Sequence, residues 1–212
     1  TDRKHSEKRL LESLKEKEVL LAEIHHRVKN NLAVITGLLE LQSYSTDNEE
    51  AQEVLVESQM RVNSIALVHE TLYQNENLSE INIENYLHKL SHILDMTIRK
   101  ESRPVHIHYD LEDITLAVTQ AVPCGLLLNE ILTNCYKHAF KGMETGKVWI
   151  SFKQKDEYLE FHIRDNGVGL PSGDMLMKSK SLGMKLIKTL SRQLGAETSF
   201  YNDDGAVFEF RF

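Results

Sequence analysis

The sequence predicts an α+β protein in two parts, a helical hairpin followed by an α/β sandwich. Apolar residues repeat with a heptad period over residues 6–42, which indicates a helix that packs against other helices. From residue 83 onward the period changes, and short alternating segments typical of strands are interspersed with amphipathic helices. The chain has 212 residues, enough for one large domain or two small ones.

The composition excludes some classes of protein. The chain is 41% hydrophobic and 27% charged, as folded soluble proteins commonly are. Its net charge of -7 gives no electrostatic support for binding nucleic acid. No apolar run reaches the roughly 18 residues of a transmembrane helix, and the stretch "TDRKHSEKRL" lacks the apolar core of a signal peptide. We therefore expect no membrane segment in this chain.

The cysteines and histidines do not form a metal or disulfide pattern. Cys124 and Cys135 lie in one predicted helix, and at about 1.5 Å of rise per residue they are too far apart to form a disulfide. The ten histidines do not combine with them into a metal-binding spacing. A reducing, cytoplasmic setting is expected.

The first half of the chain has the pattern of two long helices joined by a short loop. The apolar positions of the first helix form two series, Leu14, Leu21, Val28 and Ile35, and Leu10, Ile24 and Leu38. In the break "SYSTDNEE", Thr46 or Asp47 is expected to cap a second helix that reaches Leu72. One hairpin has too little core to be stable alone, so we expect a homodimer with a four-helix bundle. The alternative is a hairpin that packs on the second part of its own chain.

The second part predicts a mixed sheet with helices grouped on one face. The stretch "NENLSEIN" is expected to be a linker, and a helix is expected to begin at Ile83. The later predicted segments are a strand "VHIHYDL", a long helix over residues 118–140 with Pro123 near its start, a β-hairpin of "KVWISFKQ" and "YLEFHIRD", a helix from Leu182 to Leu194 that ends at Gly195, and two strands around "NDDG".

Polar side chains recur along one face of the predicted helix "LLLNEILTNCYKHAF". These are Glu130, Asn134, Lys137 and Lys141, at i, i+4, i+7 and i+11. The buried face is expected to consist of Leu128, Ile131, Leu132, Cys135 and Ala139. A carboxylate, an amide and ammonium groups in line suit a magnesium–phosphate ligand, because magnesium takes oxygen ligands and lysine binds phosphate. The alternative is a solvated face of a surface helix.

Two glycine-containing stretches follow this helix. "IRDNGVGLP" ends a strand with Asp165, a carboxylate able to accept a hydrogen bond from an exocyclic amine such as that of adenine. Its glycines permit close backbone approach to a ligand, although a simple turn also explains them. "SKSLGMKLIKTL" places Ser181 and Gly183 at a helix N-terminus, where free N–H groups favour anions. Residues 170–181 are long and non-periodic, as expected of a flap over a ligand.

The motifs occur in an order that resembles a known family. Residues 83–212 look like the ATP-binding domain shared by gyrase, Hsp90, MutL and the histidine kinases, the Bergerat fold. "NEILTNCYKHAF" resembles its N box, "DNGVGL" its first glycine box and "SLGMKL" its second, whereas no separate F box is evident. The earlier stretch "HRVKNN" resembles the phosphoacceptor box of a subfamily of sensor histidine kinases that includes the HWE kinases.

The resemblance implies the core of a two-component sensor histidine kinase. Residues 1–20 would be a signalling helix from an upstream sensor, residues 21–80 a dimerisation and phosphotransfer hairpin, and residues 81–212 the catalytic ATP-binding domain. The enzyme would use ATP and Mg2+ to phosphorylate His26, then pass the phosphoryl group to an aspartate of a response-regulator receiver domain. "TDRKHSEKRL" also looks like the exit of a PAS domain, so a sensor is expected upstream. Two other classes stay open, a Bergerat-fold ATPase that drives a clamp and a non-catalytic dimerisation scaffold.

The resemblance also assigns roles in the ATP-binding domain. Asn134 would bind magnesium, and Glu130 would polarise the γ-phosphate region or an attacking group. Lys137 and His138 would face the phosphates, and Asp165 would take the adenine amine, directly and through water. The remaining nucleotide-binding residues would shape the pocket and hinge its lid, and they are Gly167, Gly169, Ser181, Leu182 and Gly183.

Two positions depart from the family's pattern. Arg27 directly follows the candidate phosphoacceptor, where many kinases have an acid that acts as a base. Ala206 stands where the wider fold often has threonine, and without that hydroxyl we expect looser binding of adenine.

The heptad phase separates the two adjacent histidines. With Leu21 and Val28 in the seam, His25 falls at its flank and His26 falls opposite it, facing solvent. A phosphoacceptor must be reached by a second domain, and a neutral imidazole is a good nucleophile near pH 7, so His26 is the candidate. His25 is expected to pack beside the partner helix or to orient its neighbour. The alternative is two surface histidines with no task.

Three neighbours of His26 are candidates for supporting roles. Arg27 and Lys29 are expected to steady the charge of the incoming phosphoryl group. Asn30 lies one helical turn after His26, where an amide can orient water to dephosphorylate the regulator. The alternative for Asn30 is an ordinary solvent-facing polar residue.

Overall fold

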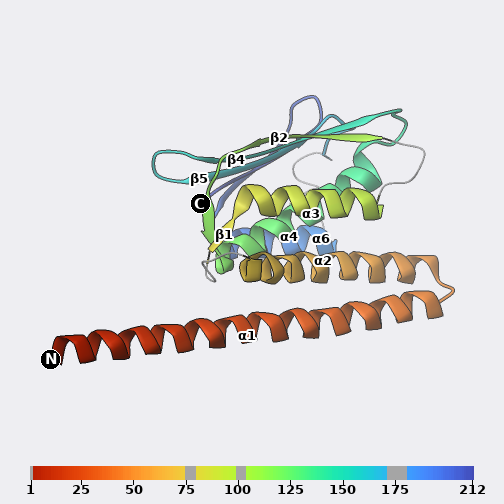
Figure 1. Ribbon diagram of the computed structural model, residues 1–212. Helices are drawn as coiled ribbons and strands as arrows, with labels where there is room; N and C mark the ends of the chain where they lie inside the picture. Colours follow the sequence, from red (N-terminus) through yellow and green to blue (C-terminus); the bar gives the residue numbers. More distant parts are fainter. Residues whose placement is uncertain (1, 75–79, 99–103, 171–180) are drawn as a thin grey trace. The chain divides into compact units, whose positions relative to one another are not determined.

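A computed structural model describes residues 2–74, 80–98, 104–170 and 181–212. The chain divides into two compact units, Thr1–Ile81 and Asn82–Phe212. The first unit is built on two long antiparallel helices, and the second combines a sheet with helices (Figure 1). The predicted fold classes of a helical hairpin and an α+β domain are therefore confirmed. In the described part of the chain, no helix has both the length and the apolarity needed to cross a membrane.

The hairpin consists of α1, Asp2–Ser45, and α2, Glu49–Gln74. Helix α1 passes residue 20 without a break, so the predicted boundary of a signalling helix falls inside one helix. The capping prediction for α2 is wrong, because the side chain of Asn48 caps the helix by accepting a hydrogen bond from Ala51 N at 2.9 Å. Thr46 lies further back, where its hydroxyl oxygen accepts from Asn48 N at 3.4 Å. Thr, Asp and Asn all make good caps, so the turn geometry decides between them.

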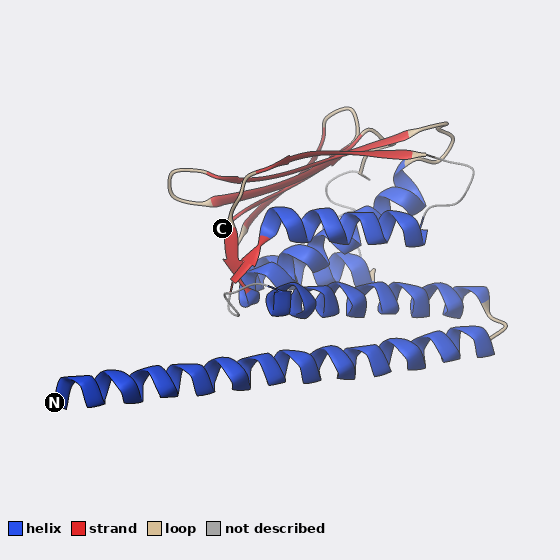
Figure 2. Cartoon of the chain, in the orientation of Figure 1, coloured by secondary structure: helices blue, strands red, loops and turns tan. Residues whose placement is uncertain are grey.

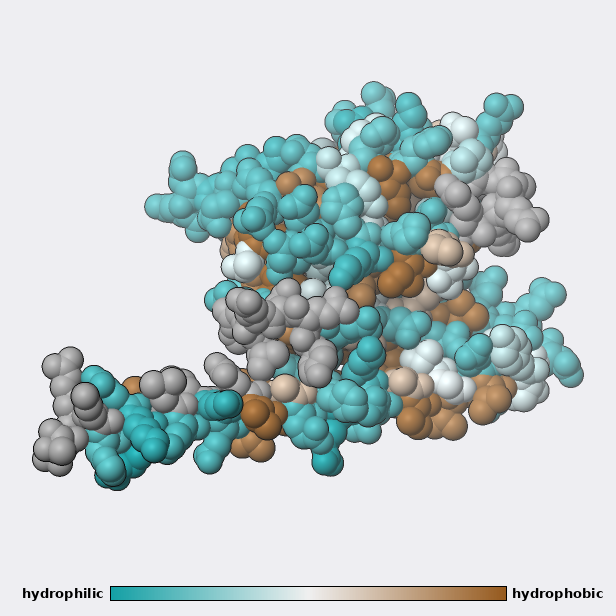
Figure 3. Space-filling view, viewed as in Figure 1, coloured by the Kyte–Doolittle hydropathy of each residue, from teal (hydrophilic) through white to brown (hydrophobic). Residues whose placement is uncertain are grey.

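Polar contacts define the face of α1 that packs on α2. Three pairs of side chains join the helices, His25–His69, Lys29–Glu70 and Thr36–Asn63. The α1 members are four and seven residues apart, as one helical face requires. Most of the predicted heptad seam lies on a different face, since four of its members remain exposed in the chain, by 42% at Leu21, 53% at Ile24, 44% at Ile35 and 61% at Leu38, whereas Val28 is half-buried. Apolar side chains accordingly gather at the surface of the hairpin (Figure 3).

The second unit contains a mixed sheet. Its strands are β2 (Val105–Leu111), β4 (Gly146–Gln154), β5 (Leu159–Asp165), β6 (Glu197–Asn202) and β7 (Ala206–Arg211), in the order β2-β4-β5-β7-β6. Strands β2 and β4 run parallel, whereas the other neighbours are antiparallel, including the predicted β4–β5 and β6–β7 hairpins. Strands β1 (Glu80–Asn82) and β3 (Thr115–Ala117), which the sequence did not predict, form a separate two-stranded sheet.

Three helices cover one face of this sheet (Figure 2). They are α3 (Ile83–Ile98), α4 (Val118–Asn134) and α6 (Leu182–Leu194). Alternate residues of the central strands point into the core, and Ile150, Phe152 and Phe161 are 0% exposed. Helix α4 is the most deeply buried of the three, with Leu127, Leu128, Ile131 and Leu132 all at 0%. The alternation that predicted these strands thus corresponds to the observed core face.

The end of α4 differs from the prediction. A single helix was expected over residues 118–140, but the α-helix ends at Asn134 and a π-helical turn, η1, spans Cys135–Ala139. The carbonyl of Ala139 accepts a hydrogen bond from Val168 N at 2.9 Å, so the loop after β5 engages the backbone where the helix ends. A π-turn widens the helical repeat, and such turns are frequent at functional sites.

Helix α6 begins and ends as predicted. The Ser181 hydroxyl accepts from Met184 N at 3.4 Å and so caps the N-terminus. Gly195 ends the helix with a φ of 67°, a left-handed conformation that glycine adopts without steric cost.

Candidate functional site

The two adjacent histidines of α1 have different surroundings. His25 is 9% exposed, and its Nδ1 lies 2.9 Å from Nδ1 of His69 on α2. His26 is exposed, because successive residues of an α-helix are turned by about 100°. The predicted orientation of His26 toward solvent therefore agrees with the structure. His25 packs beside α2 of its own chain.

Charged and polar side chains surround His26. The amide Nδ2 of Asn30 lies 3.4 Å from His26 Nδ1, which places the two side chains together on one face as predicted. The two cations expected to steady a phosphoryl group each have a carboxylate partner: Arg27 Nε is 2.6 Å from Glu23 Oε1, and Lys29 Nζ is 2.9 Å from Glu70 Oε2. Such exposed ion pairs are weak, so little free energy is needed for Arg27 and Lys29 to leave their carboxylate partners.

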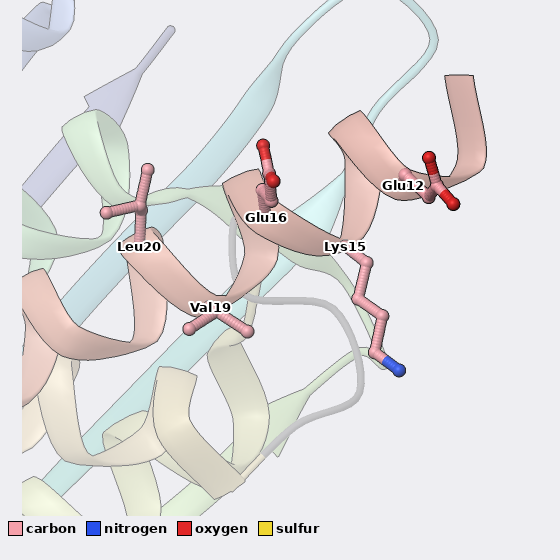
Figure 4. A pocket seen from close by; sticks show the side chains of 5 residues that line it. All are labelled: Glu12, Lys15, Glu16, Val19 and Leu20. Carbon is pink, nitrogen blue, oxygen red and sulfur yellow. The ribbon is translucent and has the colours of Figure 1, made fainter. Parts of the chain in front are cut away.

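An open hollow lies along the N-terminal half of α1. It has a volume of about 570 Å3 and is lined by Glu12, Lys15, Glu16, Val19 and Leu20 (Figure 4). These side chains follow one another along one helix, and they do not combine a nucleophile with a base or with convergent donors. We therefore do not regard this hollow as the functional site.

The polar residues of α4 and η1 differ in burial. Glu130 is 5% exposed, whereas Asn134 and Lys137 are half-buried and His138 and Lys141 are exposed. The alternative of a fully solvated stripe is therefore wrong at Glu130. The π-turn also breaks the predicted spacing, because the residues beyond Asn134 no longer follow a 3.6-residue repeat.

Glu130 reaches the start of α6. A Cβ added to Gly183 would lie 3.0 Å from Glu130 Oε2, so a side chain at this position would crowd the carboxylate. The first turn of α6, with Ser181 as its cap and Leu182 as its first residue, therefore lies beside Glu130. A carboxylate near a helix N-terminus is favoured by the helix dipole. The structure thus brings Glu130 and Gly183 together.

Asp165 is the best-defined polar group of the second unit. It ends β5, is 2% exposed, and accepts hydrogen bonds at both carboxylate oxygens. Its Oδ1 accepts from Gly167 N at 2.7 Å and from Ala206 N at 3.1 Å. Its Oδ2 lies 3.4 Å from the Cys135 thiol. Because Ala206 contributes its backbone N–H, the position where the family often has threonine still contacts the carboxylate.

Gly167 and Gly169, which follow Asp165, occupy positions where a side chain would not fit or would be strained. A Cβ at Gly167 would lie 2.4 Å from Ala139 O, so only glycine permits this approach of the loop to η1. Gly169 has a φ of 78°, which favours glycine. Both glycines are therefore explained by the conformation of the loop itself, which agrees with the alternative of a simple turn. The predicted flap lies outside the described residues over 171–180.

Three residues that contact candidate site residues or the loop after Asp165 were not assigned a site role from the sequence. They are His69, Cys135 and Asn202, of which Asn202 bonds both backbone groups of Leu170, at 2.7 Å to the N and 3.1 Å to the O. Each acts across a distance of 30 or more residues, which local spacing does not reveal. The apolar pattern of the predicted helix correctly placed Cys135 on its buried face, but it did not indicate the contact with Asp165.

Two protein families match this chain. Residues 23–97 match the family described as "Histidine kinase", and residues 119–212 match "Histidine kinase-, DNA gyrase B-, and HSP90-like ATPase". Among curated relatives, the sensor histidine kinase PdtaS of Mycobacterium tuberculosis (strain CDC 1551 / Oshkosh) is 35% identical over 184 residues, 86% of this chain and 36% of the relative. The blue-light-activated histidine kinase 2 of Erythrobacter litoralis (strain HTCC2594) is 28% identical and covers 84% of this chain and 51% of the relative.

Solved structures agree with this assignment. The histidine kinase domain of the Erythrobacter litoralis EL346 blue-light activated histidine kinase matches with a TM-score of 0.66 and 25% identity, over 91% of this chain and 92% of that one. The catalytic domain of histidine kinase ThkA shares the fold, with a TM-score of 0.52 and 18% identity over 63% of this chain.

A histidine-bearing helical hairpin followed by an ATPase-family domain defines the class of protein-histidine kinases. This chain belongs to the histidine kinase family, in the group related to the HWE kinases that the phosphoacceptor box indicated. It spans only 36% of the length of its M. tuberculosis relative.

Proposed function

We propose that this chain is the catalytic core of a sensor histidine kinase that transfers the γ-phosphoryl group of ATP to His26. The observation that carries the proposal is the contrast on α1, where one histidine is held between the helices and its neighbour is exposed beside Asn30. An exposed imidazole on a helix suits attack on a nucleotide that another domain presents. The second unit, of the ATPase family, supplies that nucleotide site.

The residues of the second unit fit a magnesium nucleotide. Asp165 would accept the adenine amine. Asn134, which is half-buried rather than sealed in the core, would hold Mg2+ through its amide oxygen. Lys137 and His138, with the first turn of α6, would bind the phosphates. Glu130 would polarise the γ-phosphate region. When bound, Mg2+ neutralises charge on the phosphate oxygens.

Asn30 would set the tautomer of the nucleophile. An amide group can be turned so that either its oxygen or its nitrogen faces a neighbour. With the oxygen toward His26 Nδ1, Nδ1–H donates to Asn30 and the lone pair lies on Nε2. Nε2 would then form the N–P bond as the bond between the γ-phosphorus and the departing ADP oxygen breaks. Arg27 and Lys29 would leave their carboxylate partners to face the phosphoryl group.

The partners follow from the same proposal. The exposed seam of α1 supports a second copy of the chain as the partner of the hairpin, giving a four-helix bundle. Phosphorylated His26 would transfer its phosphoryl group to an aspartate of a response-regulator receiver domain. A sensor domain, which residues 1–20 would connect to the hairpin, would control the reaction.

The experiment is incubation of the chain with Mg2+ and ATP labelled at the γ-phosphate. A histidine kinase retains label on the protein, in a bond that is labile in acid and stable in base. Continuous release of phosphate with no labelled protein would instead identify a clamp-type ATPase. A flat calorimetric titration with ATP and Mg2+ would identify a non-catalytic scaffold.

A further inference from the structure

Asp165 is fixed by donors from three separate elements. The loop after β5 provides Gly167 N, strand β7 provides Ala206 N, and η1 provides the thiol of Cys135. Gly205 permits the close approach of β7, because its φ is 136° and a Cβ there would lie 1.9 Å from Asp165 O. A carboxylate that is 2% exposed needs such donors to offset the loss of water.

The donors divide unequally between the two oxygens. An ionised carboxylate oxygen offers two lone pairs. Both lone pairs of Oδ1 are taken by the backbone N–H groups of Gly167 and Ala206. Among the described residues, Oδ2 accepts only from the thiol of Cys135, at 3.4 Å, and so keeps an acceptor position for a ligand.

We propose that Cys135 is a positioning residue that gives the nucleotide site its preference for a purine with an exocyclic amine, by holding Asp165 so that Oδ2 faces the base. This inference rests on the proposed function, since it concerns the same adenine subsite. Cys135 acts through Asp165, by donating its S–H to Oδ2 and preventing the carboxylate from rotating about the Cβ–Cγ bond.

The thiol is suited to act as a permanent donor. Cys135 is 2% exposed, and burial together with the nearby Asp165 carboxylate raises the pKa of its thiol well above the ordinary value. The sulfur therefore keeps its proton across the physiological range. A neutral donor on η1 supports Oδ2 of the carboxylate, whereas Ala206 on β7 has only its backbone N–H to offer to Oδ1.

The arrangement discriminates between adenine and guanine by whether the base presents a hydrogen-bond donor or an acceptor to Oδ2. The amine of adenine donates to Oδ2, whereas the O6 carbonyl of guanine presents an acceptor to an acceptor. Without the thiol, the carboxylate has one fewer restraint and its oxygen is aimed less well. Removal of the thiol should therefore lower the affinity for nucleotides that carry the amine and leave the affinity for those that lack it nearly unchanged.

The test compares equilibrium binding of ATP with that of purine riboside triphosphate, which lacks the amine, by calorimetry in the presence of Mg2+. Cys135→Ala should weaken ATP binding by about three- to tenfold, as loss of one hydrogen bond does, and leave the analogue nearly unchanged. Cys135→Ser, which restores a donor, should recover most of the preference. Cys135→Val, which lacks a donor and leaves no cavity because valine is larger than cysteine, should behave as Ala and guards against an effect of the cavity.

Cys124→Ala is the matched control, because Cys124, which lies on α4, is likewise a buried thiol and is 0% exposed. It should leave the ratio of the two affinities unchanged. If the Cys135 variants weakened both nucleotides equally, or left the ratio as in the wild type, the inference would be wrong. The proposed function is tested separately by Asp165→Asn, since wild-type protein that bound no ATP, or an unaffected Asp165→Asn, would overturn the site itself.

Discussion

His25 and His69 hold the two helices of the hairpin together through their Nδ1 atoms, which lie 2.9 Å apart. One ring has to donate and the other to accept, so the contact survives one added proton but not two. The pKa of His69 is lowered, chiefly by burial and also by the charge that His25 carries when protonated. With the Lys29–Glu70 and Thr36–Asn63 pairs, the contact lies on the face of α1 that packs on α2, and His26 lies outside that face and is exposed.

The stability of the hairpin should therefore depend on pH. Since the pKa of His69 in the folded chain lies below the ordinary 6.5, the unfolded chain takes up this proton first as the pH falls. The contribution to stability is present above pH 6.5 and is lost as the pH falls from there through the lowered pKa. Urea denaturation at about pH 7.5 and about pH 5.5 measures the difference.

A matched pair of variants isolates this effect. His69→Gln removes the titrating group and should flatten the pH dependence of unfolding. His106→Gln replaces an exposed histidine of β2 and should leave it as in the wild type. The ion pair of Lys29 with Glu70 lies one turn along and is present in both variants. Equal pH dependence in all three proteins would show that the His25–His69 contact does not contribute.

Asp165→Asn and Asn134→Ala test the nucleotide site in different ways. Replacing Asp165 removes the charged acceptor for the adenine amine, and binding of ATP should weaken on the order of ten- to a hundredfold. Asn134→Ala should remove a magnesium ligand, so the dependence of ATP binding on Mg2+ should shift to higher concentration. Calorimetric titrations over a series of Mg2+ concentrations measure both effects. ATP affinity that survived both changes would contradict the assignment of the site.

Asn30→Ala tests the role of the amide beside His26. Loss of the group that orients water should slow dephosphorylation of a phosphorylated receiver domain by on the order of tenfold. Loss of the partner of Nδ1 should also slow autophosphorylation. Gln42→Ala, which removes an exposed amide elsewhere on α1, is the control and should change neither rate. Unchanged phosphatase activity in Asn30→Ala would leave Asn30 as an ordinary solvent-facing residue.

The two thiols should be unreactive in the folded protein. Burial raises the pKa of both Cys124 and Cys135, and both are free and buried. Because the thiolate is the reactive species, titration with a thiol reagent such as Ellman's reagent should detect almost none of the thiol groups without denaturant and both in its presence. Rapid reaction of one thiol in the native protein would show that the core around α4 opens readily.

Regular periodicity made much of the fold predictable. The alternation in β4 and β5 and the signals at Ser181 and Gly195 gave elements that the structure contains. The short strands β1 and β3 were missed, because three residues carry no measurable period. The end of α4 was also missed, since the π-turn lies where the distant Val168 N donates a hydrogen bond to Ala139 O, a contact that local periodicity does not reveal.

The site was predictable in its residue types but less so in its contacts. Glu130 was selected as part of a polar stripe on one helix and Asp165 as a carboxylate at the end of a strand, whereas the contacts of His69 and Cys135 depend on how distant elements pack. The heptad pattern identified a seam, but the packing of α1 on α2 uses the adjacent face. A pattern within one helix shows that a face is apolar, and it does not show which partner covers that face.

The central claim is that His26 is the phosphoacceptor, and the direct measurement is the position of the label after incubation with Mg2+ and γ-labelled ATP. His26→Gln should abolish incorporation, whereas His25→Gln, which removes only the contact with His69, should retain part of it. Mass spectrometry of the wild type, at a pH that preserves phosphohistidine, should place the phosphoryl group on His26. Label on His25, or full incorporation by His26→Gln, would contradict the account.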